Sequence, residues 1–375
     1  MQKMALLKNN YSAWWFYIIL FCLPSYVIRF KLFNIPVTVL EGLILIGFIL
    51  LCVEYRCKLT LGHWKYVMSV FAVIGLLAVL VSDEKVAALG LYKAYIIEPM
   101  LVGCMVLTIK PKLERVLTTL SGVIILIGIT CVIQLGTGYG VPAPWHEFGA
   151  QFRATSWFGY PNAVGLLCAP IVAMLIAHVV SSTKYRTVFF VAIVLGLVSI
   201  ILSRSAGAVM AVTGATIVGV YLAGWKKLSV LSVFICVSTI PLFRETVLFQ
   251  DVSGQVRLAL WQGTINLLQH RPLQGAGLAN FPNVYAEYKL ARHTELLLYP
   301  HNIFLDFWVE LGLAGLIWLI VVLVVMFKKI KTIGWQQPKA VVLLAGLVAV
   351  LIYGLVDVPY FKNDLAVLFW VILTL

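Results

Sequence analysis

Charged residues are scarce in this chain. They make up 11% of its 375 residues, whereas ordinary soluble domains carry about 25%. This shortage leaves too little polar surface for a soluble fold and excludes a water-soluble globular protein. Instead, 62% of the residues are hydrophobic, and they gather in runs of roughly 18 to 22 residues, the length that crosses a bilayer as a helix. We therefore expect an all-α polytopic membrane protein, because helices satisfy their own backbone hydrogen bonds in lipid.

Several motifs are missing as well. The seven cysteines form no CxxC pair and lie mostly within apolar runs, which indicates buried apolar side chains rather than redox chemistry. No glycine-rich loop with its lysine is present, which argues against an ATP-driven pump. There is also no inverted internal repeat of the kind that many transporters use. No spacing of histidines, cysteines and carboxylates is typical of a metal site, so we predict no metal.

The apolar runs predict about twelve membrane spans in a single membrane domain, residues 1–375. A glycine- and proline-rich stretch separates the fifth span from the sixth, and a long polar segment separates the ninth from the tenth. The expected spans are residues 14–30, 36–53, 66–81, 86–109, 116–135, 162–180, 187–202, 206–223, 228–243, 303–327, 340–356 and 360–375.

Lysine and arginine collect in alternate connections between these spans. With the N-terminus in the cytoplasm, the inward connections carry most of the cations, such as the clusters around Lys58, Lys112 and Lys328, and the outward ones carry few. This orientation puts residues 244–302 outside the cytoplasm as one long loop. The net charge of +13 is then mainly a topology signal, and we expect no nucleic acid partner.

The outward turn at Arg204 is the most informative polar segment. It lies between two apolar runs, where an arginine near hydrocarbon is costly and is usually functional or paired. Ser203 or Ser205 is positioned to cap the next helix, whose N-terminus adds backbone N–H groups and a positive dipole end. The segment therefore predicts a phosphate-binding site. The alternative is an arginine that reaches the lipid headgroups.

Residues 255–269 of the long loop form an amphipathic pattern, with apolar residues at helical spacing around Trp261. We expect a helix that lies along the membrane face. Arg257 is one turn from Trp261, at the boundary between lipid and water, where it contacts either a headgroup or a bound anion. After the helix, Gly275 and Gly277 permit a tight backbone turn.

The long loop ends at His301 and Asn302. Asn302 is suited to cap the tenth span, and a histidine beside a helix N-terminus lies in a positive field that favours its neutral form. A neutral imidazole accepts a proton near neutral pH, as a general base must. The alternative is an interfacial histidine with a structural role. Glu310 is expected well inside the tenth span, where it neutralises a cation or bonds within the bundle.

Four segments occur in a recognisable order between residues 153 and 316. They are Arg153 with Gly159-Tyr160-Pro161-Asn162; Ser203-Arg204-Ser205-Ala206-Gly207; Arg257 and Trp261 with Arg271-Pro272-Leu273-Gln274-Gly275-Ala276-Gly277 and Phe281; and His301-Asn302 with Glu310-Leu311-Gly312-Leu313-Ala314-Gly315-Leu316. Each segment alone is loose, but the four in this order resemble the O-antigen ligase and O-antigen polymerase superfamily of bacterial membrane glycosyltransferases.

This resemblance implies a reaction class. Members of the superfamily move a glycan from an undecaprenyl-diphosphate carrier to an acceptor hydroxyl at the outer face of the bacterial cytoplasmic membrane, without a nucleotide sugar, a metal or another cofactor. The acceptor is a lipid core, a glycan or a protein, and membrane lipids are further partners. The implied site residues are His301 for the acceptor hydroxyl; Arg204, Arg257 and Arg153 for the diphosphate; and Gly275, Gly277 and Asn302 for the shape of the site.

Two other classes of function remain open from the sequence. A lipid or polysaccharide transporter would place ionisable residues along a path at mid-membrane depth, whereas the cations here gather at one face. A non-catalytic subunit of an envelope assembly would tolerate loss of His301. Ligase and polymerase share the donor chemistry and differ in the acceptor, so both remain possible within the leading class.

Overall fold

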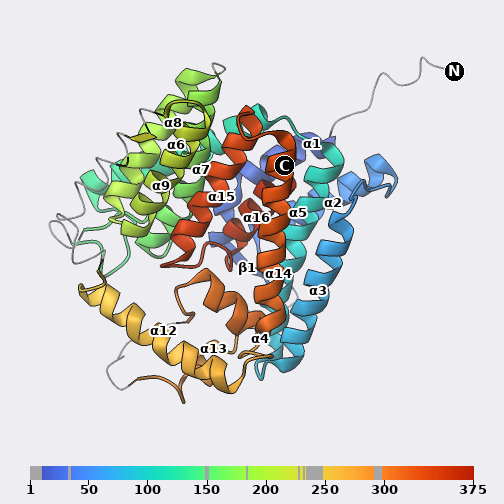
Figure 1. Cartoon of the computed structure of the whole chain (residues 1–375), viewed down its shortest axis with the longest axis vertical. Helices are drawn as coiled ribbons and strands as arrows, with labels where there is room; N and C mark the ends of the chain where they lie inside the picture. Colours follow the sequence, from blue (N-terminus) through green and yellow to red (C-terminus); the bar gives the residue numbers. More distant parts are fainter. Residues whose placement is uncertain are drawn as a thin grey trace.

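The computed structural model describes residues 11–32, 35–147, 152–182, 185–226, 229–230, 233, 248–290 and 298–375. It is an all-α protein, as predicted (Figure 1). The helices are α1 (Tyr11–Phe21), α2 (Val39–Tyr55), α3 (Trp64–Val81), α4 (Lys85–Tyr92), α5 (Glu98–Ile109), α6 (Leu113–Thr137), α7 (Pro161–Ser181), α8 (Arg186–Leu202), α9 (Ala206–Leu222), α12 (Val252–His270), α13 (Phe281–Tyr285), α14 (Ile303–Ile333), α15 (Pro338–Gly354) and α16 (Asn363–Thr374).

Five segments in the described part of the chain are long and apolar enough to cross a membrane: α3, the continuous stretch Lys85–Ile109, α6, α7 and α14. Shorter apolar helices, α1, α8, α9, α15 and α16, accompany them. Helices therefore stand at the expected positions of most of the twelve spans. The ninth expected span, residues 228–243, falls almost entirely outside the described residues.

Helix α7 lies at the centre of the bundle and contacts α8, α9 and α15. In the most hydrophobic 18-residue stretch of α7, 83% of the residues are buried, whereas 39% are buried in the corresponding stretch of α3. The exposed face of α3 is apolar, with Tyr66, Val73 and Leu80 on it, which is the surface expected of a helix that meets lipid tails. The core is thus formed around α7 and α15, and α3 lies at the edge.

The first and fourth spans depart from the sequence prediction in detail. Residues 14–30 were expected as one span, but α1 is followed by a 3₁₀-helix, Leu23–Val27, with Pro24 in its first turn. A two-stranded antiparallel hairpin comes next, β1 (Arg29–Leu32) and β2 (Ile35–Thr38), with Arg29 opposite Thr38. The stretch of the fourth span contains a π-helical segment, Lys93–Ile97, just before Pro99, whose ring nitrogen donates no hydrogen bond.

Helix α14 is not the continuous span that residues 303–327 predicted. Gly312 has φ 69° and ψ −176°, so a short helix, residues 303–311, precedes a separate long one. The backbone of the loop after α12 fills this break, because Leu313 N–H donates to Leu273 O at 3.0 Å and Ala276 N–H donates to Val309 O at 2.8 Å. A Cβ on Gly312 would lie 2.3 Å from Leu273 O, so a glycine is required here.

The break also corrects the expected setting of Glu310. This carboxylate lies at the end of the short helix, beside the loop, rather than well inside a span. It accepts a hydrogen bond from Ala279 N–H at 2.8 Å, so its observed partner is the backbone of the loop and not a buried cation.

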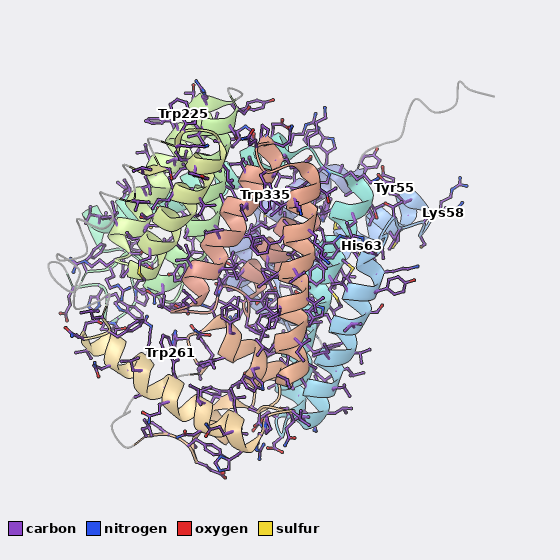
Figure 2. The ribbon with its side chains drawn as sticks, viewed as in Figure 1. Tyr55, Lys58, His63, Trp225, Trp261 and Trp335 are labelled. Atoms are coloured by element: carbon purple, nitrogen blue, oxygen red, sulfur yellow. The ribbon has the colours of Figure 1, made fainter. Side chains whose placement is uncertain are left out.

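Helix α12 includes the predicted amphipathic segment, residues 255–269, and crosses the lower end of the bundle obliquely in Figure 1. Figure 2 shows Trp261 between α12 and the bundle, whereas Tyr55, Lys58, Trp225 and Trp335 lie toward the opposite end. These four residues, which belong to three of the expected inward connections, thus lie away from Trp261 of the expected outward loop.

Candidate functional site

A cavity of about 600 Å³ separates α12 from the ends of the bundle helices. Arg153, Arg204 and Arg257, the three arginines selected from the sequence, all line it, and Asn302 lies at its wall. We call it the arginine cavity. These residues come from segments up to about 150 positions apart in the chain, and the fold brings them to one space.

Arg204 occupies the tight turn between α8 and α9 with a left-handed backbone, φ 50°. Ser205 is the N-cap of α9, but its hydroxyl forms no cap hydrogen bond and instead bonds to the Tyr353 hydroxyl. The predicted serine cap is therefore wrong, because α15 competes for that hydroxyl. Ala206 and Gly207, the first residues of α9, line the cavity beside Arg204, so the start of a helix and a guanidinium adjoin the same space.

Arg153 and Arg257 are each held by at least one backbone carbonyl from another segment. Arg153 Nε donates to Ser203 O at 2.9 Å and its Nη2 donates to Asn162 Oδ1 at 2.9 Å. Arg257 Nε donates to Val356 O at 3.0 Å and its Nη1 donates to Ser253 Oγ at 2.7 Å. The guanidinium groups are thus positioned by the fold itself.

The cavity has an excess of positive charge. Burial lowers the pKa of Arg153, and the charges of Arg204 and Arg257 lower it further. Among the described lining residues Asp251 is the one carboxylate, and its oxygen also caps α12 by accepting from Gly254 N–H at 3.2 Å. Three arginines against one carboxylate in the described lining are suited to a group with more than one negative charge.

His301 lies in the loop before α14 with φ 49°. Its Nδ1 is 3.2 Å from Asp357 Oδ1, and the Asp357 side chain is only 1% exposed. Burial raises the pKa of Asp357, but the hydrogen bond and charge of His301, together with Val358 N–H and the Arg257 charge, bring it below its ordinary value. An ionised Asp357 favours the tautomer with the proton on Nδ1, which leaves Nε2 to accept a proton.

A chain of hydrogen bonds joins His301 to the arginine cavity. Asn162 Nδ2 donates to Asp357 Oδ2 at 3.3 Å, and Asn162 Oδ1 accepts from Arg153. Asn302 caps α14 through its side-chain oxygen and donates to Leu355 O at 3.0 Å. His301 itself is not among the residues that line the cavity; it lies directly beside Asn302, which does.

Gly275 and Gly277 are not at the cavity. Both have positive φ, 63° and 86°, and a Cβ on Gly275 would lie 2.4 Å from Val309 O. Their turn packs against the short helix of residues 303–311, so they act on the site indirectly, through the position of that helix.

Asp357 is the residue of this site that sequence reasoning left without a role. Nothing in its spacing ties it to a histidine 56 residues earlier. Among the described residues, no three His, Cys, Asp or Glu side chains gather as metal ligands do, so the absence of a metal stays a prediction.

The described part of the chain is a membrane-embedded helical bundle with a cationic cavity beside a histidine–carboxylate pair. Residues 191–320 match the family model described as O-antigen ligase. This match supports the O-antigen ligase and polymerase superfamily predicted from the motifs, and it spans Arg204, Arg257 and His301 but not Arg153 or Asp357. No curated protein matches the chain. Over residues 191–320 the chain is thus similar to the O-antigen ligase family, and its apolar helices are those of a polytopic membrane protein.

Proposed function

We propose that the protein transfers a glycan from undecaprenyl diphosphate to an acceptor hydroxyl at the outer face of the bacterial cytoplasmic membrane, without a metal. The arginine cavity holds the diphosphate of the donor, with Arg204 and Arg257 as its main contacts and Arg153 as a third. Residues 244–302 form an extracytoplasmic loop that completes the active site, and Asn302, Gly275 and Gly277 give the site its shape. The acceptor is a lipid core, a glycan or a protein.

In the proposed reaction His301 Nε2 takes the proton of the acceptor hydroxyl. The acceptor oxygen attacks the anomeric carbon of the donor sugar, and the bond from that carbon to the diphosphate oxygen breaks. The electron pair leaves with undecaprenyl diphosphate, whose charge the arginines stabilise. Asp357 holds the imidazole in the tautomer that this step requires and stabilises the imidazolium that forms.

The observation that carries the proposal is the convergence of three arginines on one cavity joined to His301 through Asn162 and Asp357. A lipid diphosphate is the group with several negative charges that a membrane glycosyltransferase of this superfamily would need to bind. The amphipathic helix α12, which carries Arg257, closes one side of that cavity.

The test uses the purified full-length protein in lipid nanodiscs with a synthetic undecaprenyl-diphosphate oligosaccharide and candidate acceptors. Released undecaprenyl diphosphate and the glycosylated acceptor are measured together. We expect turnover that falls roughly 10²- to 10⁴-fold in His301→Ala, as for loss of a general base. Glu98→Gln, a buried carboxyl in α5 that lines neither this cavity nor its surroundings, is the matched control. Wild-type rates in His301→Ala would overturn the assignment of His301 as general base, and absence of turnover in the wild type would favour a transporter or an assembly subunit.

A further inference from the structure

A second cavity, of about 660 Å³, lies on the other side of the histidine–carboxylate pair. Its wall includes Tyr26, Tyr95, Tyr160 and Tyr299 together with Trp157, and we call it the tyrosine cavity. Aromatic rings with polar tips line it, which is the composition of a site for an amphipathic organic ligand.

Three segments separate the two cavities. Tyr160, Tyr299 and Val358 line the tyrosine cavity. Their near neighbours in sequence, Asn162, Asn302 and Val356, line the arginine cavity. His301 falls between Tyr299 and Asn302, and Asp357 falls between Val356 and Val358. The His301–Asp357 pair is therefore part of the wall that the two cavities share.

His301 is also coupled directly to the tyrosine side. The rings of Tyr299 and His301 have centroids 4.4 Å apart. Lys362 Nζ lies 4.4 Å from the centroid of the Tyr160 ring and 5.6 Å from that of Tyr299. This cation between two rings holds both tyrosines at the wall, next to the imidazole.

The polar groups of the tyrosine cavity differ from those of the arginine cavity. Asp306 and Glu310, one helical turn apart on the short helix of α14, both line it, and so do Arg29 and Lys362. The Asp306 side chain is 1% exposed, and neither of its oxygens has a hydrogen-bond partner among the described residues. The Tyr160 hydroxyl likewise has no partner there.

Buried polar groups without partners are costly in a folded protein. A carboxyl group forms hydrogen bonds with hydroxyl groups, so Asp306 suits a ligand that carries them. A sugar offers hydroxyl donors for Asp306 and a partner for Tyr160. The diphosphate, by contrast, is attracted to the three arginines on the far side of the wall.

We propose that the tyrosine cavity is the acceptor site, and that it binds the uncharged, hydroxyl-rich carbohydrate end of the acceptor while the arginine cavity binds the diphosphate. Asp306 and the Tyr160 hydroxyl hydrogen-bond the acceptor sugar, and the hydroxyl that reacts meets His301 at the shared wall. This assignment rests on the proposed glycosyl transfer and adds to it which cavity takes which substrate and what chemistry the acceptor end has.

Two probes separate the cavities without turnover. One is the neutral oligosaccharide released by mild acid from the surface glycolipid of the host cell, and the other is undecaprenyl diphosphate without a glycan. Their binding to the purified protein in nanodiscs is followed by tryptophan fluorescence. We expect Asp306→Asn to weaken oligosaccharide binding roughly threefold to tenfold, as for loss of one hydrogen bond, with undecaprenyl diphosphate binding unchanged. Arg257→Gln should weaken the binding of undecaprenyl diphosphate and leave oligosaccharide binding unchanged.

Two further variants show whether a change in binding reflects the cavity or a disturbed fold. Tyr160→Phe removes a hydroxyl that has no partner in the described structure, so the fold should tolerate it, and oligosaccharide binding should weaken roughly threefold to tenfold. Glu54→Gln, a carboxyl at the end of α2 that accepts from Ser12 N–H at 3.0 Å and lines neither cavity, should leave both probes bound as in the wild type.

The outcomes separate this assignment from the reaction itself. Oligosaccharide binding that is absent, or that ignores both Asp306→Asn and Tyr160→Phe, overturns the acceptor site even if the enzyme turns over. Weaker undecaprenyl diphosphate binding in Asp306→Asn overturns it as well. If the oligosaccharide binds with the expected pattern but the wild type releases no undecaprenyl diphosphate, the transfer reaction fails and the sugar site stands.

Discussion

Asp357→Asn tests the catalytic arrangement at its most sensitive point. The carboxylate accepts hydrogen bonds from His301 Nδ1 at 3.2 Å, Asn162 Nδ2 at 3.3 Å and Val358 N–H at 2.8 Å. An asparagine there has one carbonyl oxygen and an NH₂ group, so one of the two side-chain partners meets a donor instead of an acceptor. When the NH₂ faces His301, Nδ1 becomes the acceptor and the proton moves to Nε2, where the acceptor hydroxyl needs a base.

The expected effect is therefore as large as loss of the histidine. In serine proteases, removing the charge of the corresponding aspartate by a change to asparagine lowers kcat about 10⁴-fold, which corresponds to about 5 kcal/mol in the activation free energy. We expect a fall of roughly 10³- to 10⁴-fold in kcat for Asp357→Asn, with the KM for the donor little changed, because Asp357 does not line the arginine cavity.

The assay is single-turnover release of undecaprenyl diphosphate, with Glu98→Gln as the control for replacement of a buried carboxyl. The double variant His301→Ala with Asp357→Asn should be no slower than the slower single variant, because residues that act as a unit are not additive. A kcat within about threefold of the wild type in Asp357→Asn, or losses that multiply in the double variant, would refute the assignment of Asp357 as the residue that orients His301.

The pH dependence has a defined sign. Because the folded pKa of Asp357 lies below its ordinary value, the stability that its ionisation contributes is present above about pH 4 and is lost as the pH falls through the lowered pKa. Asp357 therefore stays ionised between about pH 5 and 8, and it does not titrate in the range where the rate would be measured.

Three more predictions follow from the geometry. Arg204→Lys should lower turnover at least roughly tenfold, because a lysine does not reproduce the fork of a guanidinium; an unchanged rate of undecaprenyl diphosphate release would argue against a bidentate contact. Gly312→Ala should lower the thermal unfolding temperature by several degrees, since the residue has φ 69° and its Cβ would lie 2.3 Å from Leu273 O. The control Gly42→Ala, whose added Cβ would have no atom within 4 Å, should not lower it. Equal shifts in the two variants would contradict the close approach at Gly312. A reporter enzyme fused after Asn280 should be active only outside the cytoplasm, and a cytoplasmic signal there would overturn the orientation and with it the mechanism.

The helices were predictable because the sequence pattern that indicates each of them lies within the helix itself. An apolar run of spanning length is enough to place α6 at residues 113–137, where residues 116–135 were expected, and the periodic pattern around Trp261 is enough for α12. The hairpin at residues 29–38 and the break at Gly312 were not predicted. The hairpin has no alternating pattern long enough to detect, and the break depends on a carbonyl of Leu273 that approaches from another segment.

Part of the candidate site was predictable from the sequence, because some of its residues occupy positions where they are energetically unfavourable without a partner. Arg204 in a short turn between apolar runs stands out from sequence alone because a guanidinium near hydrocarbon requires a partner. The partners themselves were not predictable. Ser205 bonds to Tyr353 rather than capping α9, and Asp357 reaches His301, because the turn after α15 packs against the loop before α14. Only the packing of distant helices decides these contacts.

The contacts of the arginines fit the charge stabilisation that we propose for this site. Each of these arginines uses one of its five N–H donors for a backbone carbonyl. Arg153 donates to Ser203 O, and Arg257 donates to Val356 O. Those bonds cross from one segment to another, so the positions of the charges are determined when the protein folds and not when a ligand arrives. Donors fixed in advance need no reorganisation as the negative charge of a leaving group develops, which is the property that accelerates a reaction.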